Sequence, residues 1–344
     1  MTPRTTLATL LGASALALAA GAATAQEVTL RLHQFLPAQA NVPRLVLDVW
    51  ADRVEAESNG RIRIERYPAM QLGGTPPELM DQVIDGVVDL AWTVNGFTPG
   101  RVPRTEVFEL PFFVQDARAA SCAYRILYES QMADTDFADV VVLANWVHGP
   151  GVIHSSRPVN TIADMAGLKL RTPSRLVGQL LGQLGAEPVG MPVTAIPENL
   201  SRGVIDGAVI PWEVTTALRI AELVNNHTEF ENSYPYTITF TLSMNRERYE
   251  GLPADLREII DRNSGMDLSI FAGGEQADAD GPARQIAVDR NNNIITIPEA
   301  GVAEWRAAAQ PVYDAWVADV AGRGIDGQAL IDEARRLMAE CAAR

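Results

Sequence analysis

A pattern of strand, helix, strand, helix and strand occurs twice along this chain, and it constrains the fold more than any other feature. The first copy covers about residues 28–93 and the second about residues 168–210. In both copies a helix ends at a glycine with similar neighbours, Asp85-Gly86-Val87-Val88-Asp89 and Arg202-Gly203-Val204-Ile205-Asp206. Such βαβαβ units build parallel sheets covered by helices. The repeat therefore predicts an α/β fold with two similar lobes, and one lobe with a single long sheet is the alternative.

The elements are located by hydrophobic periodicity and by residues that favour helix ends. Thr75-Pro-Pro-Glu78, for example, combines a cap, a proline in the first turn and a glutamate placed to reach back. The predicted strands are residues 28–33, 61–67, 87–93, 140–148, 168–172, 187–191, 204–210 and 236–244. The predicted helices are residues 41–58, 75–85, 174–184, 194–202, 256–279, 303–320 and 328–343.

Two long strands outside the repeats, residues 140–148 and 236–244, are candidates for hinges. A strand that passes from one sheet into another allows two lobes to close on each other. The predicted domains are a first lobe of residues 26–147 plus about 240–276, and a second lobe of residues 148–239 plus about 277–344 that includes a helical C-terminal tail.

The first 25 residues are predicted to be a secretory signal peptide. A basic head at Met1–Arg4 precedes an apolar stretch at Leu7–Ala22, and Ala23-Thr24-Ala25 fits the small-x-small cleavage rule. The apolar stretch is too short to span a bilayer, and no later segment has 18 consecutive apolar residues. We therefore expect a periplasmic protein without a membrane span of its own.

The chain has 43 acidic and 28 basic residues, a formal charge of −15. This balance disfavours nucleic acid and anionic membranes as partners, because both require a broad basic surface. Small molecules become the leading partner class. The two cysteines, Cys122 and Cys341, either form a disulfide in an oxidising compartment or remain separate buried thiols.

No familiar catalytic or cofactor motif is present. The sequence has no Gly-x-Ser-x-Gly elbow, no His-Glu-x-x-His, no Cys-x-x-Cys and no phosphate-binding loop, and its four histidines lack the spacing of helical metal ligands. We therefore expect neither an enzyme nor a cofactor.

Arg171 is the strongest candidate for a binding residue. It lies in Gly167-Leu-Lys-Leu-Arg171-Thr-Pro173, at the carboxyl end of a strand and just before a helix. Open α/β sheets place their ligand crevice at such strand ends. A guanidinium pairs with a carboxylate through two parallel hydrogen bonds. The alternative is a surface arginine that pairs with a neighbouring acid.

Several segments together resemble the extracytoplasmic solute receptors of tripartite ATP-independent periplasmic (TRAP) transporters. They are the signal peptide, Gly60-Arg-Ile, Gln71-Leu-Gly73, Ile84-Asp-Gly86, the segment from Gly167 to Pro173, Leu184-Gly185-Ala186 and Gly203-Val-Ile-Asp206-Gly207, in register over about residues 28–265. The resemblance implies a two-lobed flytrap receptor that hands its solute to a membrane permease. It also implies that Arg171 holds the solute carboxylate.

The sequence departs from the better-known receptors for acid sugars and dicarboxylates. Those often carry another arginine near the position of Gly149-Pro-Gly-Val-Ile153 and a polar residue near Ile210. Here aromatic residues at strands or strand ends are candidates for the cleft instead: Trp212, the most favoured of them, and Trp92, Trp146, Tyr236 and Phe240. One carboxylate anchor with apolar walls favours a monocarboxylate with an apolar or aromatic body.

The other candidate ligand-binding residues lie near the same strand ends, and all of them except Phe35 are polar. They are His33, Gln34 and Phe35 at the strand end equivalent to Arg171, Asn95 after the third strand, His148 at the first crossing, and Arg175 and Glu213 in the second lobe. Some family members hold a metal ion beside the solute with an acidic residue at this place, so Glu213 is either a cation ligand or a hinge or surface carboxylate.

The predicted function is thus a TRAP-type receptor for a small organic monocarboxylate. A receptor for a dicarboxylate or a 2-keto or hydroxy acid is the alternative within the family. The alternatives from other classes are a periplasmic enzyme acting on such an acid and a signalling receptor.

Overall fold

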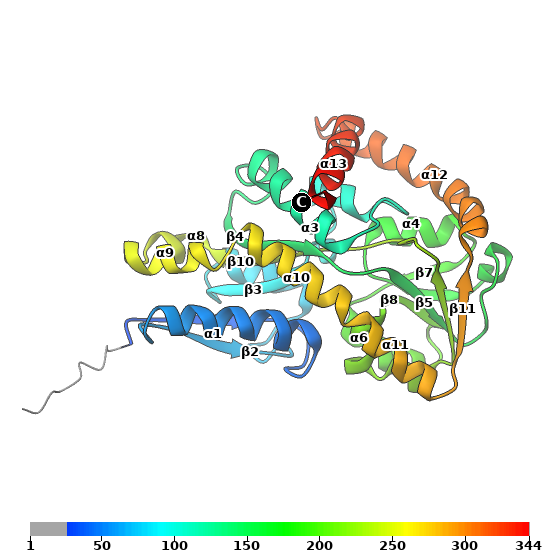
Figure 1. Cartoon of the computed structure of the whole chain (residues 1–344), viewed down its shortest axis with the longest axis horizontal. Coiled ribbons are helices and arrows are strands. Elements are labelled where there is room, and N and C mark those ends of the chain that lie inside the picture. The colour runs from blue at the N-terminus through cyan, green and yellow to red at the C-terminus, as the bar shows by residue number, and fades with distance from the viewer. Residues whose placement is uncertain (1–25, 344) are drawn as a thin grey trace, which may run out of the picture.

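Two mixed β-sheets, each covered by helices, make up the fold in the computed structural model, which describes residues 26–343 (Figure 1). The first sheet has the order β2 (Ile62–Tyr67), β1 (Val28–His33), β3 (Leu90–Val94), β10 (Thr239–Asn245) and β4 (Val140–Val147). The second has the order β11 (Asn293–Ile297), β9 (Asn226–Phe230), β5 (Gly151–Ser155), β8 (Gly207–Pro211), β6 (Lys169–Thr172) and β7 (Glu187–Gly190). The predicted two-lobed α/β fold is confirmed, and the predicted signal peptide lies outside the described residues.

Helices connect the strands and cover both sheets. The α-helices are α1 (Asp48–Glu57), α2 (Leu79–Ile84), α3 (Ala117–Leu127), α4 (Arg175–Gln183), α5 (Ile196–Ser201), α6 (Trp212–Leu218), α7 (Ile220–Leu223), α8 (Arg246–Glu250), α9 (Ala254–Arg262), α10 (Met266–Asp278), α11 (Asp280–Asp289), α12 (Glu299–Ala321) and α13 (Gly327–Ala342). Shorter 3₁₀ and π turns are η1 (Val42–Leu47), η2 (Pro76–Glu78), η3 (Asn95–Phe97), η4 (Pro103–Glu109), η5 (Tyr128–Met132), η6 (Ile162–Met165) and η7 (Val193–Ala195).

The two repeats differ from the prediction in the same way, because β3 and β8 each begin three residues later than expected. Gly86 and Gly203 adopt φ of 69° and 68°, so the chain turns before the strand starts. The aspartate that follows each turn then bonds the neighbouring strand. Asp89 accepts a hydrogen bond from the Arg31 backbone N–H at 2.7 Å, and Asp206 accepts one from Lys169 at 2.9 Å.

The chain crosses between the sheets at both predicted places. β4 of the first sheet continues through Gly149 and Pro150 into β5 of the second, and β9 of the second sheet leads into β10 of the first. A third crossing joins α10, which packs on β4, to α11, which packs on α6. These three crossings lie beside the space between the two sheets.

The C-terminal helices return toward the first lobe. α12 packs against α4, whereas α13 packs against α3, which lies over β4 of the first sheet (Figure 1). Cys122 on α3 and Cys341 on α13 form a disulfide with Cα atoms 6.0 Å apart. The predicted boundaries assign residues 277–344 to the second lobe, but this disulfide ties α13 to α3 of the first lobe. The other predicted boundaries stay a prediction.

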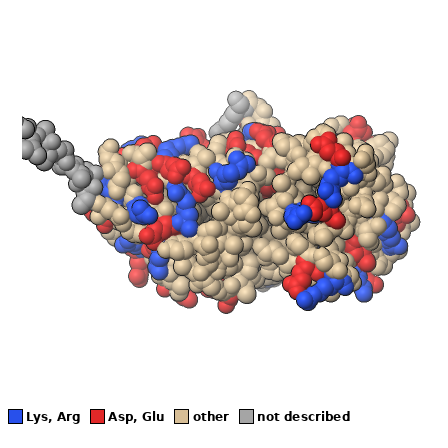
Figure 2. All heavy atoms as spheres, turned by 90° about the horizontal axis from the view of Figure 1, so that it is seen from below, with Lys and Arg blue, Asp and Glu red and all other residues tan. Residues whose placement is uncertain are grey.

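Acidic and basic side chains are interspersed on the face drawn in Figure 2, without a broad basic patch. Among residues 26–343, no helix combines the length and the apolar character that crossing a membrane requires.

Candidate functional site

A cavity lies between the two sheets, and residues from both of them line it. Its empty volume is about 410 Å³, including the part open to solvent. The lining residues are Phe35, Leu36, Trp92, Val94, Phe97, His148, Arg171, Pro173, Val193, Ile210, Pro211, Glu213, Val214, Tyr236, Ile238, Phe240 and Gln276. Most of these side chains are apolar, so the few polar ones decide what the cavity binds.

Arg171 reaches the cavity from the end of β6. Its Nε donates to the carbonyl of Met191 at 2.9 Å, and its Nη1 donates to the carbonyl of Val209 at 3.3 Å. The residue is 2% exposed, and it forms no ion pair with any acidic side chain of residues 26–343. Burial lowers the pKa of Arg171 to about 10, so the guanidinium is still cationic at neutral pH. A buried charge without a counter-ion is costly, and an anionic ligand would relieve that cost.

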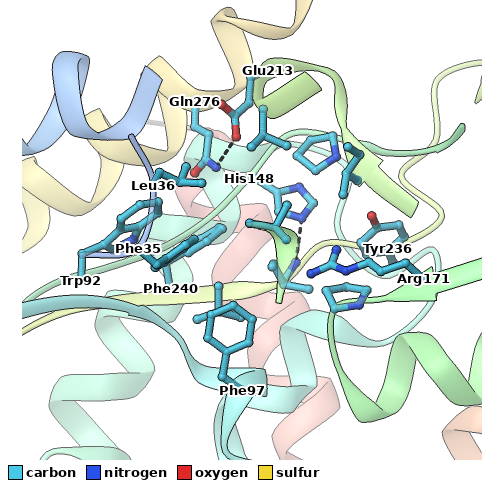
Figure 3. Close-up of a pocket in the computed structure, with 17 residues that line it drawn as sticks. Phe35, Leu36, Trp92, Phe97, His148, Arg171, Glu213, Tyr236, Phe240 and Gln276 are labelled. Atoms are coloured by element: carbon cyan, nitrogen blue, oxygen red, sulfur yellow. Dashed lines mark hydrogen bonds between the residues drawn. The ribbon is translucent and has the colours of Figure 1, made fainter. Parts of the chain in front are cut away.

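Tyr236 lies next to Arg171 in the segment that leads from β9 to β10 (Figure 3). Its hydroxyl is buried and has no hydrogen-bond partner among the described residues. Burial raises its pKa above the ordinary value, so the hydroxyl keeps its proton and can donate it to an acceptor. The tyrosine ring lies so close to Gly151 that a Cβ at this glycine would be 2.0 Å from the ring carbon Cε1. The arginine and the tyrosine together present a buried cation and an unpartnered hydroxyl to the cavity.

His148 also lines the cavity, but it is not a second cation. Its Nδ1 is bonded to the carbonyl of Gly149, and its Nε2 accepts a hydrogen bond from the Ile238 N–H at 3.2 Å. Burial lowers the pKa of His148 to about 4, so the ring is neutral at pH 7. Both ring nitrogens are used to hold the two crossing segments together.

An aromatic wall forms another side of the cavity. The rings of Phe35 and Trp92 stack with centroids 4.4 Å apart, and Phe240 lies 5.6 Å from Trp92. Phe97 meets Phe35 edge to face at 5.6 Å. The indole N–H of Trp92 is buried without an acceptor among the described residues. Flat apolar surfaces of this kind fit an aromatic or aliphatic ligand body.

Glu213 and Gln276 form a second polar group, which Figure 3 shows across the cavity from Arg171 and Tyr236. Gln276 Nε2 donates to Glu213 Oε1 at 2.7 Å. Burial raises the pKa of Glu213 to about 7. The carboxylate of Asp280 accepts the Glu213 backbone N–H at 2.8 Å and so caps α6.

The described residues contain no group of three or more His, Cys, Asp or Glu side chains arranged to hold a metal ion. A cation at Glu213 therefore stays a prediction.

The structure corrects the expectation for Trp212, which does not line the cavity. Its ring packs between His154 and His227, each with a centroid 4.9 Å away, and its Nε1–H donates to Glu229 at 3.2 Å. Trp212 and Glu213 are the first two residues of α6. Consecutive helical residues point about 100° apart, so Glu213 faces the cavity while Trp212 faces a different side of the helix.

Three polar candidates of the first lobe are also outside the lining, because each has partners elsewhere. His33 bonds Gln82 at 2.7 Å and accepts the Leu72 N–H at 3.3 Å. The amide of Gln34 bonds both backbone groups of Leu36.

Asn95 donates to the Tyr124 hydroxyl at 2.8 Å and accepts from Thr241 at 2.9 Å. It too is held away from the cavity.

Arg175 and Trp146 complete the set of candidates that do not line the cavity. Arg175 pairs with Glu106 at 2.6 Å and with Asp319 at 3.1 Å, so its charge is already balanced. Trp146 lies behind the aromatic wall, where its ring stacks on Phe240 with centroids 5.6 Å apart. Arg171, Glu213, Phe35, Trp92, His148, Tyr236 and Phe240 are the candidates that the structure brings together.

Gln276 and Phe97 also line the cavity, although the sequence did not predict either of them as a site residue. Gln276 lies on α10, within the predicted helix of residues 256–279, and its place in the site depends on Glu213, 63 positions away. Phe97 follows β3 in a short 3₁₀ turn, and its position after a strand end was the available signal.

Known proteins with the same architecture include receptors with bound aromatic acids. A TRAP solute-binding protein from Rhodoferax ferrireducens, in complex with copurified benzoate, is 48% identical, with a TM-score of 0.90 over 92% of this chain and 98% of that one. A marine metagenome TRAP solute-binding protein specific for aromatic acid ligands, in complex with 3-hydroxybenzoate, is 42% identical, with a TM-score of 0.89 over 92% and 99% of the two chains.

Sequence comparison agrees with this structural similarity. The outer membrane transporter protein TsaT of Comamonas testosteroni is 26% identical over 316 residues, which are 90% of this chain and 92% of that protein. The family described as bacterial extracellular solute-binding protein, family 7 (DctP) matches residues 36–319. Both lobes and the cavity between them lie almost entirely within that match, and the chain belongs to this family of TRAP-type solute-binding proteins.

Proposed function

We propose that this protein is the solute receptor of a TRAP transporter, that it binds a single-ring aromatic monocarboxylate, and that it delivers this acid to membrane permease subunits. The observation that carries the proposal is the buried Arg171, which has no acidic partner among the described residues and lies beside the unpartnered hydroxyl of Tyr236. A ligand carboxylate would accept hydrogen bonds from both groups and would balance the buried charge.

The apolar lining supports a monocarboxylate over a dicarboxylate. Arg171 is the single arginine or lysine among the described residues that line the cavity, and the His148 ring is neutral at pH 7. A second carboxylate would therefore be buried against aromatic rings without a cation, which is strongly unfavourable. The benzoate and 3-hydroxybenzoate bound to the two similar receptors support a ring as the body of the ligand.

Capture requires the two lobes to separate and close. The walls of the cavity are almost fully buried, Phe35 at 2% and Phe240 at 4% exposed. A direct contact also bridges the lobes, because Asn41 Nδ2 donates to the carbonyl of Glu213 at 2.9 Å. A ligand that contacts both lobes favours the closed form over the open one, since its differential affinity shifts the population. The protein binds and releases the acid unchanged, in the compartment to which a signal peptide at residues 1–25 would export it.

Titration calorimetry with benzoate, succinate and pyruvate tests this function. We expect benzoate to bind and the two aliphatic acids to bind at least about a hundredfold more weakly, since the second carboxylate of succinate has no cation in the cavity and pyruvate has no ring to pack against the aromatic wall. Arg171→Lys keeps the charge but loses the guanidinium fork, and it should weaken benzoate binding about tenfold to a hundredfold. Arg175→Lys, outside the cavity, is the control and should bind normally.

The receptor proposal fails if no carboxylate binds, or if Arg171→Lys leaves the affinity unchanged. Benzoate recovered from the protein should have its original mass, and a product in its place would favour an enzyme. Loss of uptake of labelled benzoate in cells that lack this receptor, restored by the wild-type protein, would test delivery to the permease.

A further inference from the structure

The cavity has polar side chains at two separate places, and the proposed carboxylate site accounts for one of them. The other is the pair Glu213 on α6 and Gln276 on α10, which lies across the cavity from Arg171 (Figure 3). The remaining lining is apolar, apart from the His148 ring and the indole N–H of Trp92. A ligand that had one polar end would leave Glu213 facing apolar surface.

One oxygen of Glu213 is poorly satisfied. Oε1 accepts the 2.7 Å bond from Gln276, but Oε2 has a single long contact, 3.5 Å from Asn41 Nδ2. That same amide group makes its shorter bond, 2.9 Å, to the Glu213 backbone carbonyl. A carboxylate can accept about four hydrogen bonds. Oε2 therefore has free acceptor capacity, and Glu213 is only 2% exposed.

Gln276 fixes the direction in which Glu213 points. The amide oxygen of Gln276 accepts the Trp146 Nε1–H at 2.9 Å, which determines that its Nε2 faces Glu213. A flipped Gln276 amide would place an N–H group against the indole N–H and would lose both bonds. Gln276 thus acts as a positioning residue, and Oε1 of Glu213 is held by it.

We infer that Glu213 selects aromatic carboxylates that carry a hydroxyl group on the ring, because its Oε2 accepts a hydrogen bond from that hydroxyl while Arg171 and Tyr236 hold the carboxylate. This inference rests on the proposed function. A hydroxyl supplies the donor that Oε2 lacks. A second carboxylate supplies no donor at neutral pH and is repelled by Glu213 in its ionised form.

A ligand series on the wild-type protein at pH 8, where Glu213 is ionised, is the first test. Benzoate, 3-hydroxybenzoate, 4-hydroxybenzoate and the two fluorobenzoates with fluorine in the same positions are titrated by calorimetry. Fluorine is similar in size to a hydroxyl but donates no hydrogen bond. At least one hydroxybenzoate should bind about tenfold to a hundredfold more tightly than its fluoro counterpart, which is the range for a bond to a charged acceptor.

A pair of variants then assigns the preference to Glu213. In Glu213→Gln the bond from Gln276 directs the introduced amide nitrogen toward the space of Oε2, so the hydroxy-to-fluoro ratio should fall to within about threefold. Glu109→Gln is the matched control, because Glu109 is also 2% exposed but lies outside the cavity lining. It should keep the full ratio.

The inference is overturned if the wild-type protein does not distinguish hydroxyl from fluorine, or if Glu213→Gln keeps the ratio. A uniform loss of affinity for every acid in Glu213→Gln would also overturn it, because Glu213 would then only hold the lobes together. Failure of the proposed function is distinguishable from these results, since in that case benzoate itself would not bind to the wild-type protein.

Discussion

His154 and His227 face each other across two strands of the second sheet, with their Nδ1 atoms 2.7 Å apart. His227 Nε2 accepts a bond from Asn292 at 2.9 Å, and His154 Nε2 is 3.2 Å from the carbonyl of Ile210. Every ring nitrogen therefore has a partner when both rings are neutral: His227 Nδ1–H donates to His154, and His154 Nε2–H donates to Ile210. Because Ile210 lines the cavity, this pair supports the cavity wall from behind.

The histidine pair should make the protein acid-sensitive. Burial lowers the pKa of His227 from 6.5 to about 4, against the opposing effect of Glu229, and it lowers the pKa of His154 well below 6.5. The unfolded chain therefore binds more protons, and stability present above pH 6.5 is lost as the pH falls toward 4. Over this fall in pH, we expect the titration of His227 to lower the free energy of unfolding, measured in urea, by up to about 3 kcal/mol.

His227→Asn keeps a donor that faces His154 but cannot gain a proton in this range. Between pH 7 and pH 4.5, the His227→Asn protein should lose less unfolding free energy than the wild-type protein loses. Equal losses in the two proteins would show that the pair does not cause the acid sensitivity.

Buried carboxyl groups should produce the opposite trend at higher pH. Glu109 accepts hydrogen bonds from the backbone and the side chain of Thr239 at 3.2 and 2.9 Å, and burial, with a smaller effect of Glu106, raises its pKa from 4.5 to about 7. The folded chain thus holds a proton that the unfolded chain releases. The stabilising contribution, complete below pH 4.5, is lost as the pH rises through 7.

Glu109→Gln should therefore reduce the decline in thermal midpoint between pH 5 and pH 8. The loss of unfolding free energy that it removes at pH 8 should be about 1–3 kcal/mol. Glu106→Gln, at a partly exposed neighbour, provides the comparison. A decline that is unchanged in Glu109→Gln would mean that this carboxyl titrates normally.

The disulfide between Cys122 and Cys341 should contribute to stability but not to binding. It closes a loop between positions 219 residues apart and ties α13 to α3. Cross-links of this kind stabilise proteins by about 2–4 kcal/mol, mainly by restricting the unfolded chain. Residues of α3 and α13 are absent from the cavity lining.

Cys341→Ala, combined with Cys122→Ala to avoid a free thiol, should therefore lower the denaturation midpoint and leave benzoate affinity unchanged. The reduced wild-type protein is the control and should match the double variant. A large loss of affinity would show that α13 is coupled to the cavity.

The fold was largely predictable because periodicity and helix ends are local properties of the sequence. The late start of β3 and β8 was not predictable, because it depends on hydrogen bonds to neighbouring strands. Asp89 accepts one from the Arg31 backbone N–H at 2.7 Å, and Asp206 accepts one from the Lys169 backbone N–H at 2.9 Å. Each aspartate is distant in sequence from its partner, so the periodicity of the segment itself carries no sign of the bond.

The site was predictable at strand ends and unpredictable elsewhere. Arg171 was found because the carboxyl end of a strand places a side chain at the crevice. Trp212 and Glu213 are adjacent in sequence, and only the rotation of the first turn of α6 decides which one faces the cavity. Gln276 is in the site because Glu213 and Trp146 from different elements bond it at 2.7 and 2.9 Å, which no local pattern reveals.

Gly151 should prove necessary for the position of Tyr236, and hence for binding. A Cβ at Gly151 would lie 2.0 Å from Tyr236 Cε1 and 2.4 Å from Cζ, distances that force the ring to move. Because Gly151 lies in β5 between two crossing segments, the backbone cannot shift easily away. Gly151→Ala should therefore displace the tyrosine hydroxyl from Arg171 and weaken benzoate binding by about tenfold, the value of one hydrogen bond to a charged group.

Gly182→Ala is the control for this change, because a Cβ at Gly182 meets nothing within 4 Å. Gly182 lies in α4, where alanine is favoured over glycine by roughly 0.5–1 kcal/mol, so this variant should be slightly more stable and bind benzoate normally. Tyr236→Phe, which lacks the hydroxyl but keeps the ring, should match the affinity of Gly151→Ala. If Gly151→Ala binds as tightly as the wild-type protein while Tyr236→Phe does not, the ring has room to move without losing the ligand, and the glycine does not position it.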